Sequence, residues 1–325
     1  MATLSRRSLL ALSAGAFVSG VRGAQAQAYP DRTIRYVVPY PPGGFNDTLG
    51  RIVVQKLQEA WGQTAFVDNR PGGGTLIGTD AVAKAAPDGH TLLGIAFPFG
   101  AIPSLYRNLP YDSVKDFTPV MYAGQSSNLF VVKPSLPVKS VQELIAAAKT
   151  SPGKLTYGST GSGSSNHLSM ELFKSMAKVD ITHVPYKGSA PMTTDLLGGH
   201  IDMAFDNTPN VLPHVKAGTM RAIGISSPTR GALTPDVPTV SEAGVPGYEV
   251  GVWFGVVGPA GMRPEVVAKL NAELNRMLAM PDVKEKFAQQ GVDPVGGTPE
   301  KFGDHIKEQI TKWAGVIKDA GIKPE

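Results

Sequence analysis

The chain has 325 residues, with 31 Lys or Arg, 27 Asp or Glu and no cysteine. Residues 1–28 hold three arginines and no acid, so their removal would lower the formal net charge from +4 to +1. A nearly neutral chain lacks the concentrated basic face that nucleic-acid binding requires. The absence of cysteine excludes disulfides, thiol nucleophiles and cysteine-based metal sites.

The first 28 residues have the layout of an export signal. The motif SRRSLL at positions 5–10 matches the twin-arginine pattern, and an apolar run from Leu9 to about Val18 follows it. This run is well short of the ~20 residues that a membrane-spanning helix needs. We therefore predict export to the periplasm with cleavage near Ala26 or Ala28, by the twin-arginine route or by the Sec route.

Short β-rich runs alternate with helical patterns along most of the remaining chain, which is typical of parallel α/β units. The first predicted strand leads into a predicted helix over 47–61, and the tail from Pro264 onward has helical spacing throughout. We predict an α/β fold with mixed, mostly parallel sheets. The predicted strands are Thr33–Pro39, Ala65–Asp68, Thr91–Phe97, Leu129–Lys133, Leu155–Ser159, Thr182–Pro185, Ile201–Asp206 and Arg221–Ser226.

The length after export allows two domains, at roughly 100–200 residues each. No low-complexity linker separates them, so the chain must cross between two lobes more than once. The stretches Val120–Val132 and Tyr248–Val257 are the expected crossings. We predict one lobe from residues 29–127 plus 249–325, and a second lobe from residues 128–248.

The segment PYPPGGFND at 39–47 joins the first predicted strand to the first predicted helix. Its glycines allow a ligand to approach the backbone, and unpaired N–H groups at a helix start favour an anion. A plain turn with Asn46 or Asp47 as the helix cap is the alternative. As carboxylate contacts we predict Tyr40, Pro42, Gly43, Gly44, Phe45, Asn46 and Asp47.

Glycine-rich and hydroxyl-rich junctions recur later in the chain. The segment YGSTGSGSSNH at 157–167 precedes another helix, and two further junctions, at 184–191 and 205–209, place a Ser or Thr before a helix. Because ligands bind at the carboxyl ends of strands in open α/β sheets, we expect these loops to converge on one cleft. The further predicted contacts are Ser159, Thr160, Gly161, Ser162, Ser164, His167, Tyr186, Lys187, Gly188 and Asp206.

Asp206 would accept a hydrogen bond from a donor group on the ligand, or else it would cap a helix. Gly78, in the glycine-rich stretch that begins at Asn69, is predicted to line the cleft from the first lobe. Phe97 and Trp253 are candidate apolar walls, with core packing as the alternative.

Signatures of catalysis and of cofactor binding are missing. The chain has no G-x-S-x-G nucleophile elbow and no Walker A motif, and the glycines at 161–166 do not complete a dinucleotide fingerprint. His167 and Glu171 lie four residues apart but have no third partner at metal-ligand spacing. We predict no catalytic residue, no metal and no cofactor. A hydrolase using Ser164 or Ser165 with His167 is the remaining enzymatic alternative.

Several segments are familiar as a set: YPDRTIRYVVPYPPGGFNDTLGR, VDNRPGGG, APDGHTLL, YGSTGSGSSNHLSMELF, HVPYKGSAPMTTDLLGGHIDMAFD and GVWFGVVGPAG. From about Tyr29 to the C-terminus the chain resembles the Bug family, the extracytoplasmic solute-binding receptors of tripartite tricarboxylate transporters. The resemblance implies a class II periplasmic-binding-protein fold whose two lobes close on a di- or tricarboxylate, an acidic amino acid or an aromatic carboxylate.

By the same resemblance, the loops matching Tyr40–Asp47 and Ser159–Ser164 hold the ligand, Asp206 lies beside it, and the receptor serves transporter membrane subunits. Phe45 stands where the family commonly has a small residue, which favours a ligand with an apolar or aromatic body. We expect a monomer. A ligand sensor for a signalling membrane protein is the alternative, and the residues do not specify which carboxylate binds.

Overall fold

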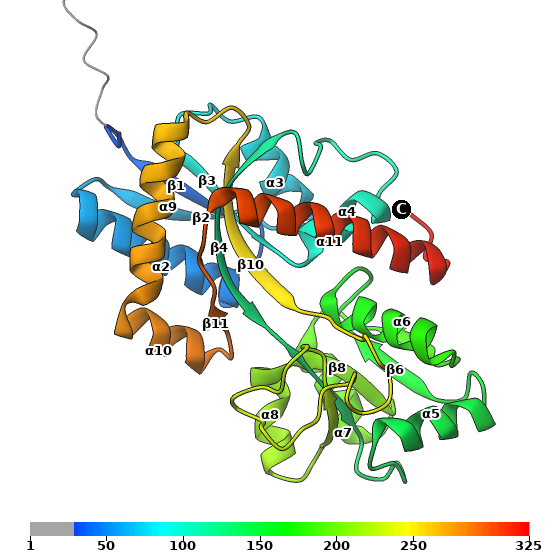
Figure 1. Cartoon of the computed structure of the whole chain (residues 1–325). Coiled ribbons are helices and arrows are strands. Elements are labelled where there is room, and N and C mark those ends of the chain that lie inside the picture. The colour runs from blue at the N-terminus through cyan, green and yellow to red at the C-terminus, as the bar shows by residue number, and fades with distance from the viewer. Residues whose placement is uncertain (1–28, 325) are drawn as a thin grey trace, which may run out of the picture.

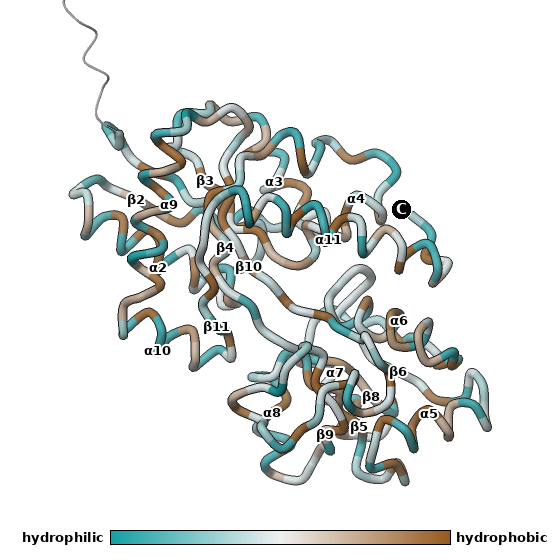
Figure 2. Tube along the Cα trace, in the orientation of Figure 1, coloured by the Kyte–Doolittle hydropathy of each residue, from teal (hydrophilic) through white to brown (hydrophobic). Residues whose placement is uncertain are grey.

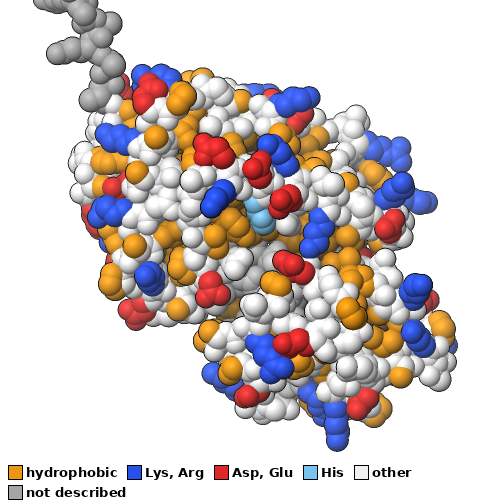
Figure 3. All heavy atoms as spheres, in the orientation of Figure 1, with side chains coloured by type: hydrophobic (Ala, Val, Ile, Leu, Met, Phe, Trp, Pro, Cys, Tyr) orange, Lys and Arg blue, Asp and Glu red, His pale blue; other side chains and the backbone are white. Residues whose placement is uncertain are grey.

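The computed structural model describes residues 29–324 and has two α/β lobes joined by extended segments (Figure 1). The predicted export signal, residues 1–28, lies outside the described residues. The space-filling view shows a larger and a smaller lobe, with charged side chains of both signs scattered over the face in view (Figure 3). The predicted α/β fold with mixed sheets is confirmed.

Lobe 1 is built on a six-stranded sheet in the order β11-β4-β10-β3-β1-β2. The pairs β1–β2 and β1–β3 are parallel, whereas β10 is antiparallel to both β3 and β4, and β11 is antiparallel to β4. The strands are β1 (Ile34–Val38), β2 (Ala65–Asn69), β3 (Thr91–Ala96), β4 (Phe117–Ser126), β10 (Val252–Pro259) and β11 (Asp293–Pro294).

Lobe 2 is built on a five-stranded sheet in the order β7-β6-β8-β5-β9. β6 is parallel to β7 and β8, and β5 is antiparallel to β8 and β9. The strands are β5 (Asn128–Val132), β6 (Thr156–Ser159), β7 (Thr182–Pro185), β8 (Met203–Asn207) and β9 (Arg221–Ile225).

Helices surround both sheets (Figure 1). In lobe 1 they are α2 (Phe45–Trp61), α3 (Leu76–Ala83), α4 (Pro98–Leu105), α9 (Pro264–Ala279), α10 (Pro281–Gln289) and α11 (Pro299–Asp319), with a 3-10 turn at Gly73–Thr75. In lobe 2 they are α5 (Val141–Thr150), α6 (Ser165–Ala177), α7 (Ser189–Gly198) and α8 (Thr208–Lys216).

Sequence pattern explains how α2 forms and packs. Leu49, Ile52, Val53 and Leu57 recur at helical spacing and are all buried, so they form the apolar stripe that faces the core. The helix ends at Gly62, which adopts φ 68° and donates its N–H to Gln58. Along the chain trace, apolar residues concentrate on the strands and on the inward sides of the helices (Figure 2).

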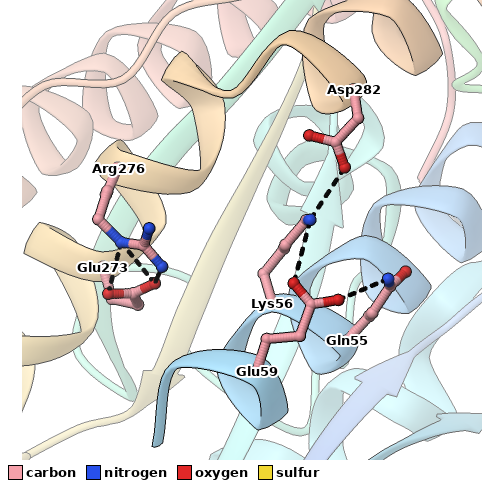
Figure 4. A network of polar contacts seen from close by, with 6 residues as sticks. All are labelled: Gln55, Lys56, Glu59, Glu273, Arg276 and Asp282. Carbon is pink, nitrogen blue, oxygen red and sulfur yellow. Dashed lines mark hydrogen bonds and ion pairs between the residues drawn. The ribbon is translucent and has the colours of Figure 1, made fainter.

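A polar bridge joins α2 to α10 on the outside of lobe 1 (Figure 4). The Lys56 ammonium lies 3.1 Å from the Glu59 carboxylate and 2.9 Å from that of Asp282. Lys56 is itself largely buried, so its stem packs between the helices while its charge is paired at the surface.

The two lobes are connected by strands that run side by side. β4 ends at Ser126 and β5 begins at Asn128 in the other sheet, while the chain returns from lobe 2 to enter β10 at Val252. β4 and β10 pair from Phe117↔Pro259 to Ser126↔Val252, so both connections leave lobe 1 at the same place. The exact division at 127/128 and 248/249 stays a prediction.

β4 and β10 are the main difference from the expected elements. These two segments overlap the stretches predicted as crossings between the lobes, and they form central strands of the lobe 1 sheet. All residues of β10 are buried, so the strand lacks the alternation of apolar and polar residues that marks a half-exposed strand.

Candidate functional site

A cavity of about 380 Å³ lies between the two lobes. Lobe 1 contributes the segments that follow β1, β2 and β3, and lobe 2 contributes the loop that follows β6. These are carboxyl ends of parallel strands, where α/β proteins bind ligands. The wall consists of Pro39, Tyr40, Pro41, Pro71, Gly72, Gly74, Thr75, Pro98, Ile102, Leu105, Tyr106, Thr160, Gly161, Ser162, Gly163, Ser164, Ile322 and Lys323.

The lobe 2 wall is a loop held by its own hydrogen bonds. The Ser164 hydroxyl accepts from the His167 N–H as the cap of α6 and donates to the Gly161 carbonyl at 2.7 Å. Thr160 donates from its hydroxyl to Asn166 at 2.7 Å. Gly161 adopts φ 127°, a conformation that side chains other than glycine rarely adopt. Ser162 is exposed at the tip of this loop.

Two histidines lie beneath this loop. The rings of His167 and His183 stack with centroids 4.4 Å apart, and Nδ1 of His167 accepts from the Gly163 N–H at 3.1 Å. Nε2 of His183 lies 2.7 Å from the hydroxyl oxygen of buried Ser159. Burial lowers the pKa of His167 to about 4, and the adjacent His183 lowers it as well. A neutral His167 is the form that can accept from Gly163.

The lobe 1 loop is anchored by Asp47. Its carboxylate accepts from the Gly43 N–H at 3.2 Å and from the Asn69 amide at 3.0 Å, and it pairs with Arg51. Burial opposes its ionisation, but the hydrogen bonds from Arg51, Asn69 and Gly43 outweigh burial and lower the pKa of Asp47. The loop between β1 and α2 is therefore fixed from inside the protein.

Of the residues predicted to contact the ligand, those that reach the cavity are Tyr40, Thr160, Gly161, Ser162 and Ser164. Pro42, Gly43 and Gly44 lie exposed in the loop next to Tyr40, and a β-carbon on either glycine would meet open space. Gly44 is the cap of α2, so the alternative in which Asn46 or Asp47 caps this helix is wrong. Asn46 is buried in the first turn of the helix.

Asp206 is a junction between three helix starts of lobe 2. It is 1% exposed and accepts hydrogen bonds from the Ser189 hydroxyl, from the amides of Asn166 and Asn210, and from the Asn207 N–H. Burial raises the pKa of Asp206 against the effect of these hydrogen bonds. The carboxylate does not line the 380 Å³ cavity.

Other predicted contacts also lie away from this cavity. Tyr186 donates its hydroxyl to Asp195 at 2.7 Å, Lys187 is exposed, and Gly188 caps α7. His167 and Ser159 support the loop from below, as described above.

Phe97 and Trp253 belong to the core, as their alternative interpretation predicted, and Phe45 packs against that core. Phe97 packs edge-on against Trp313, with ring centroids 4.8 Å apart, and Trp253 is 1% exposed. Phe45 contacts Phe254 and Phe287 within lobe 1. Gly78 packs against Pro39, where a β-carbon would lie 2.9 Å from the proline ring.

The cavity also contains residues that sequence reasoning missed. Ile102, Leu105 and Tyr106 form an apolar wall from α4 and its C-cap, and Ile322 and Lys323 come from the end of the chain beyond α11. The α4 residues lie at helical spacing directly after a predicted strand, a signal that was available. Nothing local connects Ile322 or Lys323 to this site.

A larger hollow of about 810 Å³ lies within lobe 1, between α9, α11 and the start of β4. Lobe 2 contributes nothing to its wall, so movement of the lobes could not enclose a molecule there. Across residues 29–324, no group of three or more His, Asp or Glu side chains could hold a metal ion. In that same range, no helix is both long and apolar enough to cross a membrane.

Comparison with known proteins identifies the family. Residues 49–322 match the model of the tripartite tricarboxylate transporter family receptor. The chain is 40% identical to Protein BugT of Bordetella pertussis (strain Tohama I) over 300 residues, 92% of each chain. It resembles the solved structure of Rpa4515 of R. palustris with adipate, at 40% identity and a TM-score of 0.80, over 91% of this chain and 100% of the other.

A second structure, MatC (Rpa3494) of Rhodopseudomonas palustris with bound malate, is 33% identical with a TM-score of 0.76, over 89% of this chain and all of that chain. The family and these neighbours are binding receptors and not enzymes, which removes the hydrolase alternative. As its sequence motifs predicted, the chain belongs to the family of tripartite tricarboxylate transporter receptors that includes the Bug proteins.

Proposed function

We propose that the protein captures a small carboxylate in the cavity between its lobes and delivers it to the membrane subunits of a tripartite tricarboxylate transporter. The observation that carries the proposal is the convergence of two loops from different lobes on one cavity, represented by Tyr40 and Ser162. Adipate and malate, named with two structures of similar proteins, are small dicarboxylates. The volume of about 380 Å³ suits such a molecule.

The polar groups at the cavity are of the kind that binds carboxylates. On the lobe 2 loop, the hydroxyls of Thr160 and Ser164 already donate to Asn166 and Gly161, so it is the Ser162 hydroxyl, with backbone N–H groups of the glycine-rich loops, that can donate to a carboxylate. The wall also contains apolar side chains such as Ile102 and Leu105. A micromolar dissociation constant corresponds to about 8 kcal/mol. Several hydrogen bonds to a charged carboxylate, at about 1.5–3 kcal/mol each, can supply this free energy in a closed cleft.

Export of the mature chain to the periplasm completes the proposal. A receptor that meets its solute there needs no catalytic group, because closure of the lobes both buries the ligand and alters the surface presented to membrane subunits. A deletion strain distinguishes transport from sensing: we expect uptake of the ligand to fail. Loss of a transcriptional response with normal uptake would favour the sensor instead.

Ligand binding is tested by thermal unfolding of purified residues 29–325 after unfolding and refolding to remove any bound solute. The panel contains aliphatic, amino and aromatic carboxylates. At one hundred times its dissociation constant, a specific ligand adds about 2.7 kcal/mol and raises the melting temperature by several degrees. A folded protein whose melting temperature no carboxylate shifts would contradict the proposal.

The location of binding is tested with Ser162→Phe. The aromatic ring would occupy the cavity without disturbing the core, because Ser162 is exposed. We expect unchanged stability without ligand and at least tenfold weaker binding. Ser151→Phe, at an exposed position beyond α5, is the matched control and should bind as the wild type does. Equal affinity in all three proteins would place the site elsewhere.

A further inference from the structure

The cavity between the lobes has one cation in its wall. Of the residues that line it, Lys323 alone carries a charged side chain, and the others are apolar, hydroxyl-bearing or glycine. Lys323 is exposed and makes no salt bridge with an acid of residues 29–324. A lysine that lines an otherwise uncharged cavity can extend its ammonium to an anionic group inside it.

A defined helix ending places Lys323 at the cavity. After α11, Gly321 adopts φ 65° and donates its N–H to the Lys318 carbonyl at 3.0 Å, and Ile322 donates to the Ile317 carbonyl at 3.1 Å. This pair of bonds is the Schellman motif, which reverses the chain over the last helical turn. Ile322 then packs against the hydrophobic core and fixes the position of the next residue.

The helix that carries this turn is itself held at the junction of the lobes. α11 packs along α4 in lobe 1 and also contacts α6 in lobe 2. Lys312 donates to the Glu249 carbonyl at 2.6 Å, in the segment that returns from lobe 2. The end of α11 and the two glycine-rich loops therefore border the same space, and Figure 1 shows α11 beside α4.

We infer that the turn after α11 belongs to the ligand site and that the Lys323 ammonium pairs with a second carboxylate of the ligand, which selects dicarboxylates over monocarboxylates. This inference rests on the proposed function. Backbone N–H groups of the glycine-rich loops and the Ser162 hydroxyl bind the first carboxylate through hydrogen bonds. A second carboxylate in the apolar part of the cavity needs its own partner, because a charge without one is costly to desolvate. Lys323 supplies that partner.

The test compares ligands that differ by one carboxylate. Isothermal titration calorimetry measures binding of adipate against hexanoate, and of terephthalate against benzoate, to wild type, Lys323→Met, Lys323→Arg and the control Lys318→Met. Lys318 is exposed in the last turn of α11 and does not line the cavity, so its loss changes the net charge equally without touching the site.

We expect Lys323→Met to weaken binding of the preferred dicarboxylate about three- to tenfold and to leave its monocarboxylate partner unchanged, as for loss of one partly exposed ion pair. Lys323→Arg should stay within about twofold of the wild type. Salt should weaken dicarboxylate binding more in the wild type than in Lys323→Met.

Three results would overturn the inference while leaving the proposed function intact. The first is equal dicarboxylate affinity in wild type and Lys323→Met, and the second is an equal loss in Lys318→Met, which would indicate general electrostatic attraction. The third is wild-type binding of monocarboxylates alone. Failure of the wild type to bind any carboxylate in the wider panel would instead contradict the proposed function itself.

Discussion

Asp47 shows how a single residue prepares a loop to receive a ligand. Its two oxygens accept from Gly43, Asn69 and Arg51, so each lone-pair direction is engaged by a donor. The carboxylate thus holds the loop in place from its buried side and leaves the loop backbone exposed. An acid close to a carboxylate site would repel the ligand if it faced the cavity, but Asp47 is buried and paired.

Asp47→Asn tests this role. The new amide would turn a donor toward groups that also donate, so we expect a loss of about 1–3 kcal/mol in the free energy of unfolding, measured by urea denaturation. Because hydrogen bonds lower the pKa of Asp47, its stabilisation is present above its unfolded pKa and is lost as the pH falls. Asp304→Asn, which removes an exposed pair with Lys307, is the control and should cost less than about 0.5 kcal/mol. Equal stabilities of the two variants would refute the anchoring role.

At the residue scale, the sequence predicted the glycine and hydroxyl loops of the cavity wall because their chemistry is local. Gly161 and Ser162 stand in a recognisable junction between a strand and a helix. Asp206 was predicted beside the ligand, and the structure places its carboxylate among donors from three helices. The pattern around an acid shows that it is unusual, but only the packing shows what its oxygens contact.

Lys323 marks the limit of such reasoning. Lys323 follows a long amphipathic helix, α11, and reaches the cavity because α11 packs along α4 and contacts α6. No spacing in the sequence encodes that arrangement, which depends on tertiary packing between elements about two hundred residues apart.

At the scale of elements, the buried His167 in the first turn of α6 makes the stability of the protein depend on pH. Burial lowers the pKa of His167 to about 4, whereas an unfolded chain binds this proton near pH 6.5. Between these values the unfolded state binds more protons, so stability falls as the pH is lowered from about 6.5 to about 4. Protonation would also remove the acceptor for the Gly163 N–H.

We therefore expect His167→Gln to have a shallower decline in unfolding free energy over this pH range than the wild type, by an amount on the order of 3 kcal/mol. Some decline remains in this variant, because burial also lowers the pKa of His305 to about 4 and His305 still contributes to the loss of unfolding free energy. The measurement is urea denaturation at a series of pH values. His200→Gln, at an exposed position after α7, is the control and should keep the wild-type slope. An unaltered slope in His167→Gln would show that His167 does not carry this dependence.

Element prediction succeeded where an apolar run has clear boundaries. The strands next to helices in both lobes were expected within one or two residues, because apolar runs bounded by glycine or proline are clear signals. β4 and β10 were missed as strands because both overlap the stretches assigned to crossings between the lobes, and a single residue separates β4 from β5. Burial along the whole length does not explain the difference, since β5 is equally buried and was predicted.

At the scale of the whole molecule, the two lobes already touch beside the cavity. A β-carbon placed on Gly163 in lobe 2 would lie 2.3 Å from Cδ1 of Leu105 in lobe 1. On the opposite side, one on Gly291 would lie 2.8 Å from the Pro209 ring, so contacts flank the connecting strands as well. Glycine at these places allows the lobes to approach more closely than any other residue would.

If closure onto a carboxylate requires this approach, a larger side chain at Leu105 should prevent it. We expect Leu105→Trp to hold the lobes apart and to weaken ligand binding at least tenfold, because the loops of the two lobes could no longer contact one molecule together. Small-angle X-ray scattering with saturating ligand should show a decrease in the radius of gyration for the wild type and a smaller one, or none, for the variant. Leu197→Trp, at an exposed position on α7, is the control for the added ring. A Leu105→Trp protein that contracts and binds like the wild type would mean that closure onto the ligand does not require the close approach of Leu105 and Gly163.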